Sequence, residues 1–394
     1  MSKVRALLSS VVMLASLSLS GCGHYNCNSG AMFGNSSCTA TGGGLSSGGS
    51  GTAGDVAVFD FFLDGGQLDG ASLDTAGVFS LIPNFVSPPQ VSSGVGGMVI
   101  VQKQWLYISF NGSADVEGYS IDATTGALTA ITGGPFVSPD TNAMTSDPAG
   151  KFLFLLGADT DEVSVFTINQ TSGALTLVGT FPAGVGFAEQ ATTDGLGKFL
   201  YVTAGKLGSS VAVFSIGSTG ALTLVAGSPF AISIAQLEGE PTGKFLLGVT
   251  GNGANNGFAS DNHVYVYSIN QTSGVITPAT GSPFATTYTP STLTVHPSGS
   301  FVYTFNQTVT GTSPTEGFQF NTTTGVLTEV TGSPFTALTA PAGQFDQSGA
   351  YLFMHPSTNL SVASVNTTTG ALTSISSPIT SIGSPVGWAV TDPN

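Results

Sequence analysis

Two glutamates, Glu189 and Glu238, are the residues of this sequence best placed to do chemistry. In the repeat described below, each lies near the start of an inner strand, so both are expected at the mouth of a central channel. Two carboxylates can transfer protons or hold a hard cation such as Ca²⁺. They are therefore the predicted catalytic residues, and two solvated rim residues are the alternative. No cofactor is predicted, and a bound Ca²⁺ is left open without a specific indication.

Further polar residues are predicted to bind a ligand at the same mouth. They lie near the start of inner strands or in the loops above them: Asn142, Gln190, Gln236, Lys206 and His263. His296 and His355 are isolated in the sequence, so a turn or capping role is predicted for both. No pair of His and Cys residues has zinc spacing, so no metal site is predicted. Asp60 and the acids that follow it are expected at the surface.

The elements that must position these residues come from an internal repeat. Its "TGxLT"-like signature places a glycine at positions 126, 173, 220, 274, 325 and 370, with spacings of 47, 47, 54, 51 and 45 residues. A second signature, "GKFLFLL" at Gly150 and "GKFLYVT" at Gly197, precedes the later copies. A period of this length with several short strands per copy is typical of a β-propeller.

Each copy is expected to form four strands separated by Gly, Asn, Ser and Thr turns. In one copy the predicted strands are residues 141–147, 151–157, 162–168 and 174–179. The recurring phenylalanine of the "SPF"-like motif is predicted to pack between blades, at positions 136, 230, 284 and 335. The sequons in these turns, such as Asn169, are interpreted as turn residues.

The two ends of the chain are expected to complete one blade together. "VGWAVTDPN" (386–394) reads as a lone first strand, and its partners are predicted near the N-terminus, in "GDVAVFDF" from Gly54, in 67–73 and around Gly77. Closing the ring in this way removes exposed sheet edges. The predicted fold is an all-β, seven-bladed propeller over residues 54–394, with four antiparallel strands per blade.

The N-terminal segment reads as an export signal followed by a tether. Lys3 and Arg5 precede an apolar stretch that is too short to span a membrane. "LSGC" then resembles a bacterial lipobox, which implies a signal peptide over 1–21 and a lipid on Cys22. The Gly- and Ser-rich segment 22–53 is predicted to be a flexible tether. The expected location is the cell envelope, anchored by lipid, with the outer membrane favoured. Whether Cys27 pairs with Cys38 stays open.

The charge of the chain excludes one class of partner. The formal net charge is −15, and removal of residues 1–21 leaves 5 Lys against 22 acids, or −17. Nucleic-acid binding needs clusters of Lys and Arg, and the single arginine, Arg5, lies in the predicted signal peptide. A monomer that contacts the membrane only through its lipid is expected, with a small molecule, glycan or protein as ligand.

The repeats resemble a known family. "DPAGKFLFLL", "VSVFTINQTSGALT" and "HPSGSFVYTFN" are similar to the lactonase-type seven-bladed propellers, also described as YVTN-type repeat proteins. That family includes 6-phosphogluconolactonase and carboxymuconate cyclase, besides many exported repeat proteins. The resemblance implies the fold. For activity it implies a lactone hydrolase, whereas the cyclase-like members use His, Arg and Glu, and the predicted mature chain contains no Arg.

Two functions therefore remain after the resemblance. The first is a binding or scaffold module at the cell envelope. It is favoured by the absence of Arg from the predicted mature chain, by the tether and by a surface made mainly of Thr, Ser and Gly. The alternative is a hydrolase acting on an unphosphorylated sugar lactone, because a phosphorylated one needs cationic groups to hold it. In either case the ligand is expected on the face of the second-to-third-strand loops, where the longest insertions fall.

Overall fold

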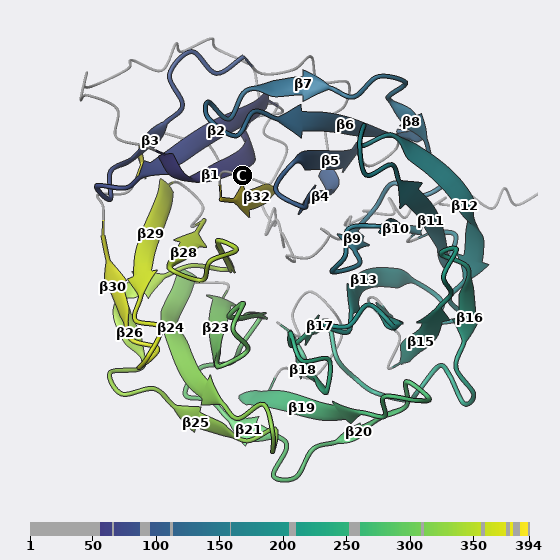
Figure 1. Ribbon diagram of the computed structural model, residues 1–394. Coiled ribbons are helices and arrows are strands. Elements are labelled where there is room, and N and C mark those ends of the chain that lie inside the picture. The colour runs from purple at the N-terminus through teal and green to yellow at the C-terminus, as the bar shows by residue number, and fades with distance from the viewer. Residues whose placement is uncertain are drawn as a thin grey trace, which may run out of the picture.

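The computed structural model describes a closed ring of seven antiparallel sheets around a central channel (Figure 1). It describes residues 56–64, 67–86, 95–110, 113–157, 159–204, 210–251, 261–308, 311–355, 359–375, 379–380 and 387–392. The all-β, seven-bladed prediction is confirmed. Within these residues no helix is long and apolar enough to cross a membrane.

The first three blades follow each other along the chain, each starting with the strand nearest the channel. Blade 1 contains β4 (Val95–Val101), β5 (Trp105–Phe110), β6 (Asp115–Ile121), β7 (Leu128–Ala130) and the short β8 (Phe136–Val137). Blade 2 contains β9 (Met144–Ser146), β10 (Phe152–Gly157), β11 (Glu162–Ile168) and β12 (Leu175–Pro182). Blade 3 contains β13 (Ala188–Thr193), β14 (Phe199–Ala204), β15 (Val211–Ile216) and β16 (Leu222–Leu224).

The next three blades each carry a fifth short strand that pairs with the third. Blade 4 contains β17 (Gln236–Gly239), β18 (Phe245–Val249), β19 (His263–Ile269), β20 (Ile276–Pro278) and β21 (Phe284–Ala285). Blade 5 contains β22 (Thr292–Val295), β23 (Phe301–Thr308), β24 (Gly311–Phe320), β25 (Leu327–Glu329) and β26 (Phe335–Thr339). Blade 6 contains β27 (Gly343–Phe345), β28 (Tyr351–Met354), β29 (Asn359–Val365), β30 (Leu372–Ser374) and β31 (Ile379–Thr380).

Blade 7 is built from both ends of the chain. Its order is β3 (Phe79–Leu81), β2 (Gln67–Asp74), β1 (Val56–Asp64) and β32 (Trp388–Thr391). β32 pairs antiparallel with β1 over four residue pairs, from Phe59 opposite Thr391 to Phe62 opposite Trp388. The predicted closure by a C-terminal first strand is therefore confirmed, and Figure 1 shows β1 and β32 side by side next to the channel.

The second strand of each blade is mostly apolar because both of its faces are buried. In β10, Leu153 and Leu155 pack toward Tyr107 of blade 1, whereas Phe154 and Leu156 pack toward blade 3. Alternating residues of a strand point to opposite faces, so each such strand contributes to two cores. No blade could bury both faces alone, and this is the physical reason for the repeat.

The predicted turn and packing residues behave as expected. The Asn169 carboxamide oxygen accepts hydrogen bonds from the backbone N–H groups of Thr171 and Ser172, at 2.9 and 3.0 Å, which makes it a turn residue. The phenylalanine of the "SPF"-like motif is buried in the core at position 136, and at positions 230, 284 and 335 it is partly buried and packs against the core.

Candidate functional site

A cavity of about 540 Å³ lies at one end of the channel. It is lined by the ends of inner strands and by the turns that lead to the second strands, in blades 1 to 6. The sequence analysis expected the ligand at the opposite end, on the face of the second-to-third-strand loops. Residues 252–260 of the longest insertion there lie outside the described residues.

Glu238 on β17 lines this cavity. Its Oε1 accepts hydrogen bonds from the backbone N–H of Val295, at 3.1 Å, and from the Thr294 hydroxyl, at 3.5 Å. Within the described residues its Oε2 has no hydrogen-bond partner. Burial raises the pKa of Glu238 to about 8, and the two hydrogen bonds oppose this shift only in part. The carboxyl group therefore changes charge near neutral pH, as a proton-transferring group should.

Neutral hydrogen-bonding side chains surround Glu238 in the cavity wall. Thr192, Thr294 and Gln344 come from the inner strands of blades 3, 5 and 6. The buried Gln344 Oε1 has no hydrogen-bond partner in the described part of the chain. A ligand with several hydroxyl groups would find donors and acceptors on more than one blade here.

The acidic residues at the rim of the cavity have a structural task. Asp147 accepts a hydrogen bond from the N–H of Phe152 at 2.6 Å, Asp194 one from Phe199 at 2.7 Å, and Asp346 one from Tyr351 at 2.7 Å. Each carboxylate thus caps the turn that starts a second strand. The sequence analysis did not identify this repeated role, although an acid lies three residues before the glycine of every "GKF"-type signature except the one at Gly299, where His296 takes its place.

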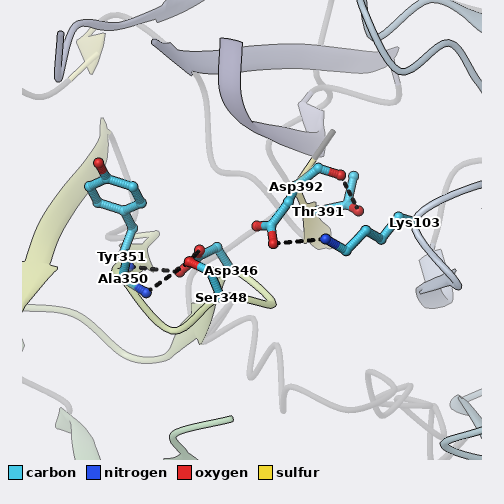
Figure 2. A network of polar contacts seen from close by, with 7 residues as sticks. All are labelled: Lys103, Asp346, Ser348, Ala350, Tyr351, Thr391 and Asp392. Atoms are coloured by element: carbon cyan, nitrogen blue, oxygen red, sulfur yellow. Dashed lines mark hydrogen bonds and ion pairs between the residues drawn. The ribbon is translucent and has the colours of Figure 1, made fainter. Parts of the chain in front are cut away.

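Lys103 and Asp392 join the first and seventh blades beside the rim. The Lys103 ammonium lies 3.1 Å from Oδ2 of Asp392, just after β32 (Figure 2). Desolvation raises the pKa of Asp346 to about 6, with a smaller contribution from the neighbouring Asp392. Three successive blades, 6, 7 and 1, therefore share one group of charges at this end of the ring.

Gln190 and Gln236 connect inner strands to one another. The Gln190 carboxamide donates to the Leu237 carbonyl and accepts from the Leu237 N–H, both at 2.9 Å. Gln236 makes the same two bonds to Leu293, at 3.0 and 2.6 Å. Both glutamines are buried, so these contacts occupy side chains that were predicted to bind a ligand.

Glu189 and Glu238 lie at different depths of the channel. Gln190 and Gln236 mark equivalent places in their strands, since they make the same contacts. Glu189 comes one residue before its glutamine and Glu238 two residues after, a separation of roughly 10 Å along a strand. Glu189 is 6 % exposed on β13. The structure does not bring the two together in the cavity, and the role of Glu189 stays a prediction.

The remaining predicted site residues are separate from the cavity. Asn142, just before β9, is 7 % exposed, and neither atom of its amide has a hydrogen-bond partner among the described residues. His263 lies at the start of β19, with Nδ1 at 3.7 Å from Asp261. Lys206 and Cys22 lie outside the described residues. No group of three or more His, Cys, Asp or Glu side chains in the described part could hold a metal ion.

Two predictions about single residues have clear outcomes. The turn role of His296 is confirmed, since Nδ1 contacts Ser298 at 2.7 Å and Nε2 contacts the Gly349 carbonyl at 2.8 Å. The expectation that Asp60 lies at the surface is wrong. Its side chain is fully buried, because β1 is sandwiched between β2 and β32 and covered by blade 6.

Comparison with known proteins agrees with the fold. The family model "Lactonase, 7-bladed beta-propeller" matches residues 55–188. No curated protein matches the sequence. The structure is similar to Pseudomonas aeruginosa periplasmic gluconolactonase, with 13 % identity, a TM-score of 0.64, and coverage of 86 % of this chain and 100 % of that chain.

Two further solved structures show the same likeness. A Bacteroides uniformis protein, which carries the name 6-phosphogluconolactonase as a provisional assignment, has 15 % identity and a TM-score of 0.67, and the match covers 85 % of this chain and 99 % of that one. A protein from Lactobacillus plantarum has 15 % identity and a TM-score of 0.63, over 86 % and 99 %. At these identities the structures support the fold alone. Residues 55–188 therefore match the family model of the lactonase seven-bladed propellers, and the remaining blades continue the same fold.

Proposed function

We propose that this protein hydrolyses an unphosphorylated sugar lactone in the cavity at the end of its channel. The observation that carries the proposal is Glu238, a carboxyl group that lines the cavity, has an Oε2 without a hydrogen-bond partner among the described residues and has a pKa raised to about 8. The family match and the gluconolactonase-like fold support a lactone rather than another substrate. They favour this function over the binding or scaffold module that the sequence composition favours.

In the proposed reaction Glu238 acts as general base. Its ionised Oε2 takes a proton from a water molecule as the water oxygen attacks the lactone carbonyl. The ring C–O bond then breaks, the alkoxide takes the proton back from Glu238, and the product is an open-chain hydroxy acid. The Gln344 carboxamide and the Thr192 hydroxyl lie on the cavity wall, where they can hydrogen-bond to the sugar hydroxyls.

The charges of the cavity support a neutral substrate. Asp147, Asp194 and Asp346 surround the mouth, and the nearby Lys103 is engaged by Asp392. A phosphate group would meet several carboxylates without a free cation among the described residues of the wall. Discrimination against phosphorylated lactones is expected to weaken at high salt, where such repulsion is screened.

The proposal is tested by following acid release from gluconolactone and from its 6-phosphate, with the spontaneous rate subtracted. The proposed function predicts turnover of the neutral lactone and a much lower kcat/KM for the phosphorylated one. A folded protein that accelerates neither reaction would leave the binding module as the better account.

The N-terminal segment is proposed to place this activity at the cell envelope. The lipobox-like sequence that ends at Cys22 supports export and lipid anchoring. Mass spectrometry of the protein made in a bacterial host would find a diacylglyceryl group on Cys22. A mature chain without lipid would contradict this part of the proposal.

A further inference from the structure

A buried acid, a histidine and a tryptophan meet where the two chain ends close the ring. The Nε2 atom of His355 lies 3.2 Å from Oδ2 of Asp60, and both side chains are fully buried. The His355 ring stacks on the Trp388 indole, with centroids 4.4 Å apart and planes 9° from parallel. Phe62 packs edge-on against the same imidazole, at 6.5 Å. This group takes no part in the proposed lactone chemistry.

The three residues come from three segments that must meet for the ring to close. Asp60 is on β1, directly opposite Val390 of β32. Trp388 is the first residue of β32, and His355 directly follows β28 of blade 6. β32 is four residues long and lies between the channel and β1. The pair therefore holds the strand that completes blade 7 against both its own blade and its neighbour.

The pair has a charge-balanced state only while it carries a single proton. With one proton it is either an ion pair or a neutral acid beside a neutral imidazole, and its net charge is zero. Loss of that proton leaves a carboxylate in an apolar core, which is strongly unfavourable.

The direction of the titration follows from what surrounds Asp60. Burial raises the pKa of Asp60, and the charge of His355 and its hydrogen bond oppose the shift. On the strands packed against this group, the other titratable residues are Asp69 and Asp74 of β2, Tyr351 of β28 and Asp392 after β32. None of these residues contributes to the shift in the pKa of Asp60.

We propose that Asp60 and His355 form a proton-dependent clasp on β32, which holds the strand while the pair keeps its shared proton and loosens it at alkaline pH. A group whose folded pKa is raised stabilises the fold at low pH and loses that contribution as the pH rises through the folded pKa. Because Asp392 at the end of β32 is bound to Lys103 beside the cavity, loosening the strand also removes one contact from the cavity rim.

The test uses the full chain with Trp105→Phe. The chain has two tryptophans, so Trp388 then reports alone on its stacked neighbour. Between pH 6 and 9.5 the clasp predicts a reversible change in Trp388 fluorescence, which Asp60→Asn abolishes and His263→Gln leaves in place. A flat profile, or one that survives Asp60→Asn, would overturn the proposal.

A second measurement on the unmodified chain covers the case in which a variant does not fold. Hydrogen exchange of the amides of β32 is compared with that of β14 and corrected for the intrinsic pH dependence of exchange. The clasp predicts that the protection of β32 falls by up to about tenfold for each pH unit as the pH rises toward the pKa of the pair in the folded chain and levels off above it, whereas β14 stays protected. Equal behaviour of the two strands would contradict it.

Discussion

The carboxamide of Gln236 replaces a backbone partner for Leu293, since it donates to the Leu293 carbonyl at 3.0 Å and accepts from its N–H at 2.6 Å. Gln190 makes the same pair of bonds to Leu237. The inner strands of blades 3, 4 and 5 are thus joined by side chains, although each belongs to a different sheet. This connection fixes the part of the channel wall that carries Glu238.

Gln236→Met is expected to lower the free energy of unfolding by about 2 kcal/mol, because it leaves a buried N–H and a buried carbonyl without partners. Chemical denaturation measures the loss. Gln319→Met, at an exposed position of β24, is the matched control and should change stability little. Equal effects of the two substitutions would show that the hydrogen bonds of Gln236 do not stabilise the ring.

The tyrosines of the second strands form a second set of contacts between blades. Tyr303 is fully buried, and its hydroxyl donates to the Gly370 carbonyl of blade 6 at 2.7 Å. Tyr303→Phe should cost about 1 kcal/mol, the typical contribution of one hydrogen bond. Thermal unfolding compares it with Tyr265→Phe, whose hydroxyl binds the partly exposed Asp261 and should matter less. A larger loss for Tyr265→Phe would contradict this ranking.

Position 349 requires a glycine for two reasons, which are the backbone conformation of its turn and the close contact with a neighbouring blade. Its φ is +75°, and a Cβ atom there would lie 2.4 Å from Nε2 of His296. Gly133 has a φ of +93° but open space around it. Gly133→Ala should cost about 1 kcal/mol from the backbone conformation alone. Gly349→Ala should lower the stability measured by thermal unfolding clearly more than Gly133→Ala does. Equal losses of stability would show that the His296 side chain can move aside without destabilising the fold.

Much of the fold could be predicted because it depends on local patterns. Turn residues, apolar second strands and the spacing of Gly126 and Gly150 all follow from the repeat, and β11 has the predicted bounds. Contacts between blades were harder to predict from the sequence. Gln190 and Gln236 are polar residues near the channel, and nothing in their types separates a ligand contact from a bond to the next strand.

The site was predicted only in part, because it too depends on contacts between strands of different blades. Glu238 was selected by its residue type and its inner strand, but its depth in the channel depends on how neighbouring strands are aligned. The burial of Asp60 depends on β32, which lies more than 300 residues away in the sequence. The two ends of a ring meet only through the whole fold, so the pairing of Asp60 with His355 has no local signal.

Asp346 should titrate at about pH 6, because burial disfavours its ionised form and the negative charge of Asp392 adds to this effect. Removing that charge with Asp392→Asn should lower the pKa of Asp346. Carbon-detected NMR of the carboxyl groups follows this titration directly. An unchanged or raised pKa in the variant would contradict the proximity of the two acids. Asp159→Asn, in the exposed β10–β11 turn, serves as control.

The pH dependence of gluconolactone hydrolysis tests the role of Glu238 most directly. With a pKa of about 8 for the general base, kcat/KM should rise as the pH increases and level off above pH 8, after subtraction of the spontaneous rate. Glu238→Gln should lower kcat/KM by about 100-fold or more and abolish this rise, whereas Glu162→Gln on β11 should keep both. A Glu238→Gln protein that retains the rate and the pH profile of the unmodified chain would contradict the account.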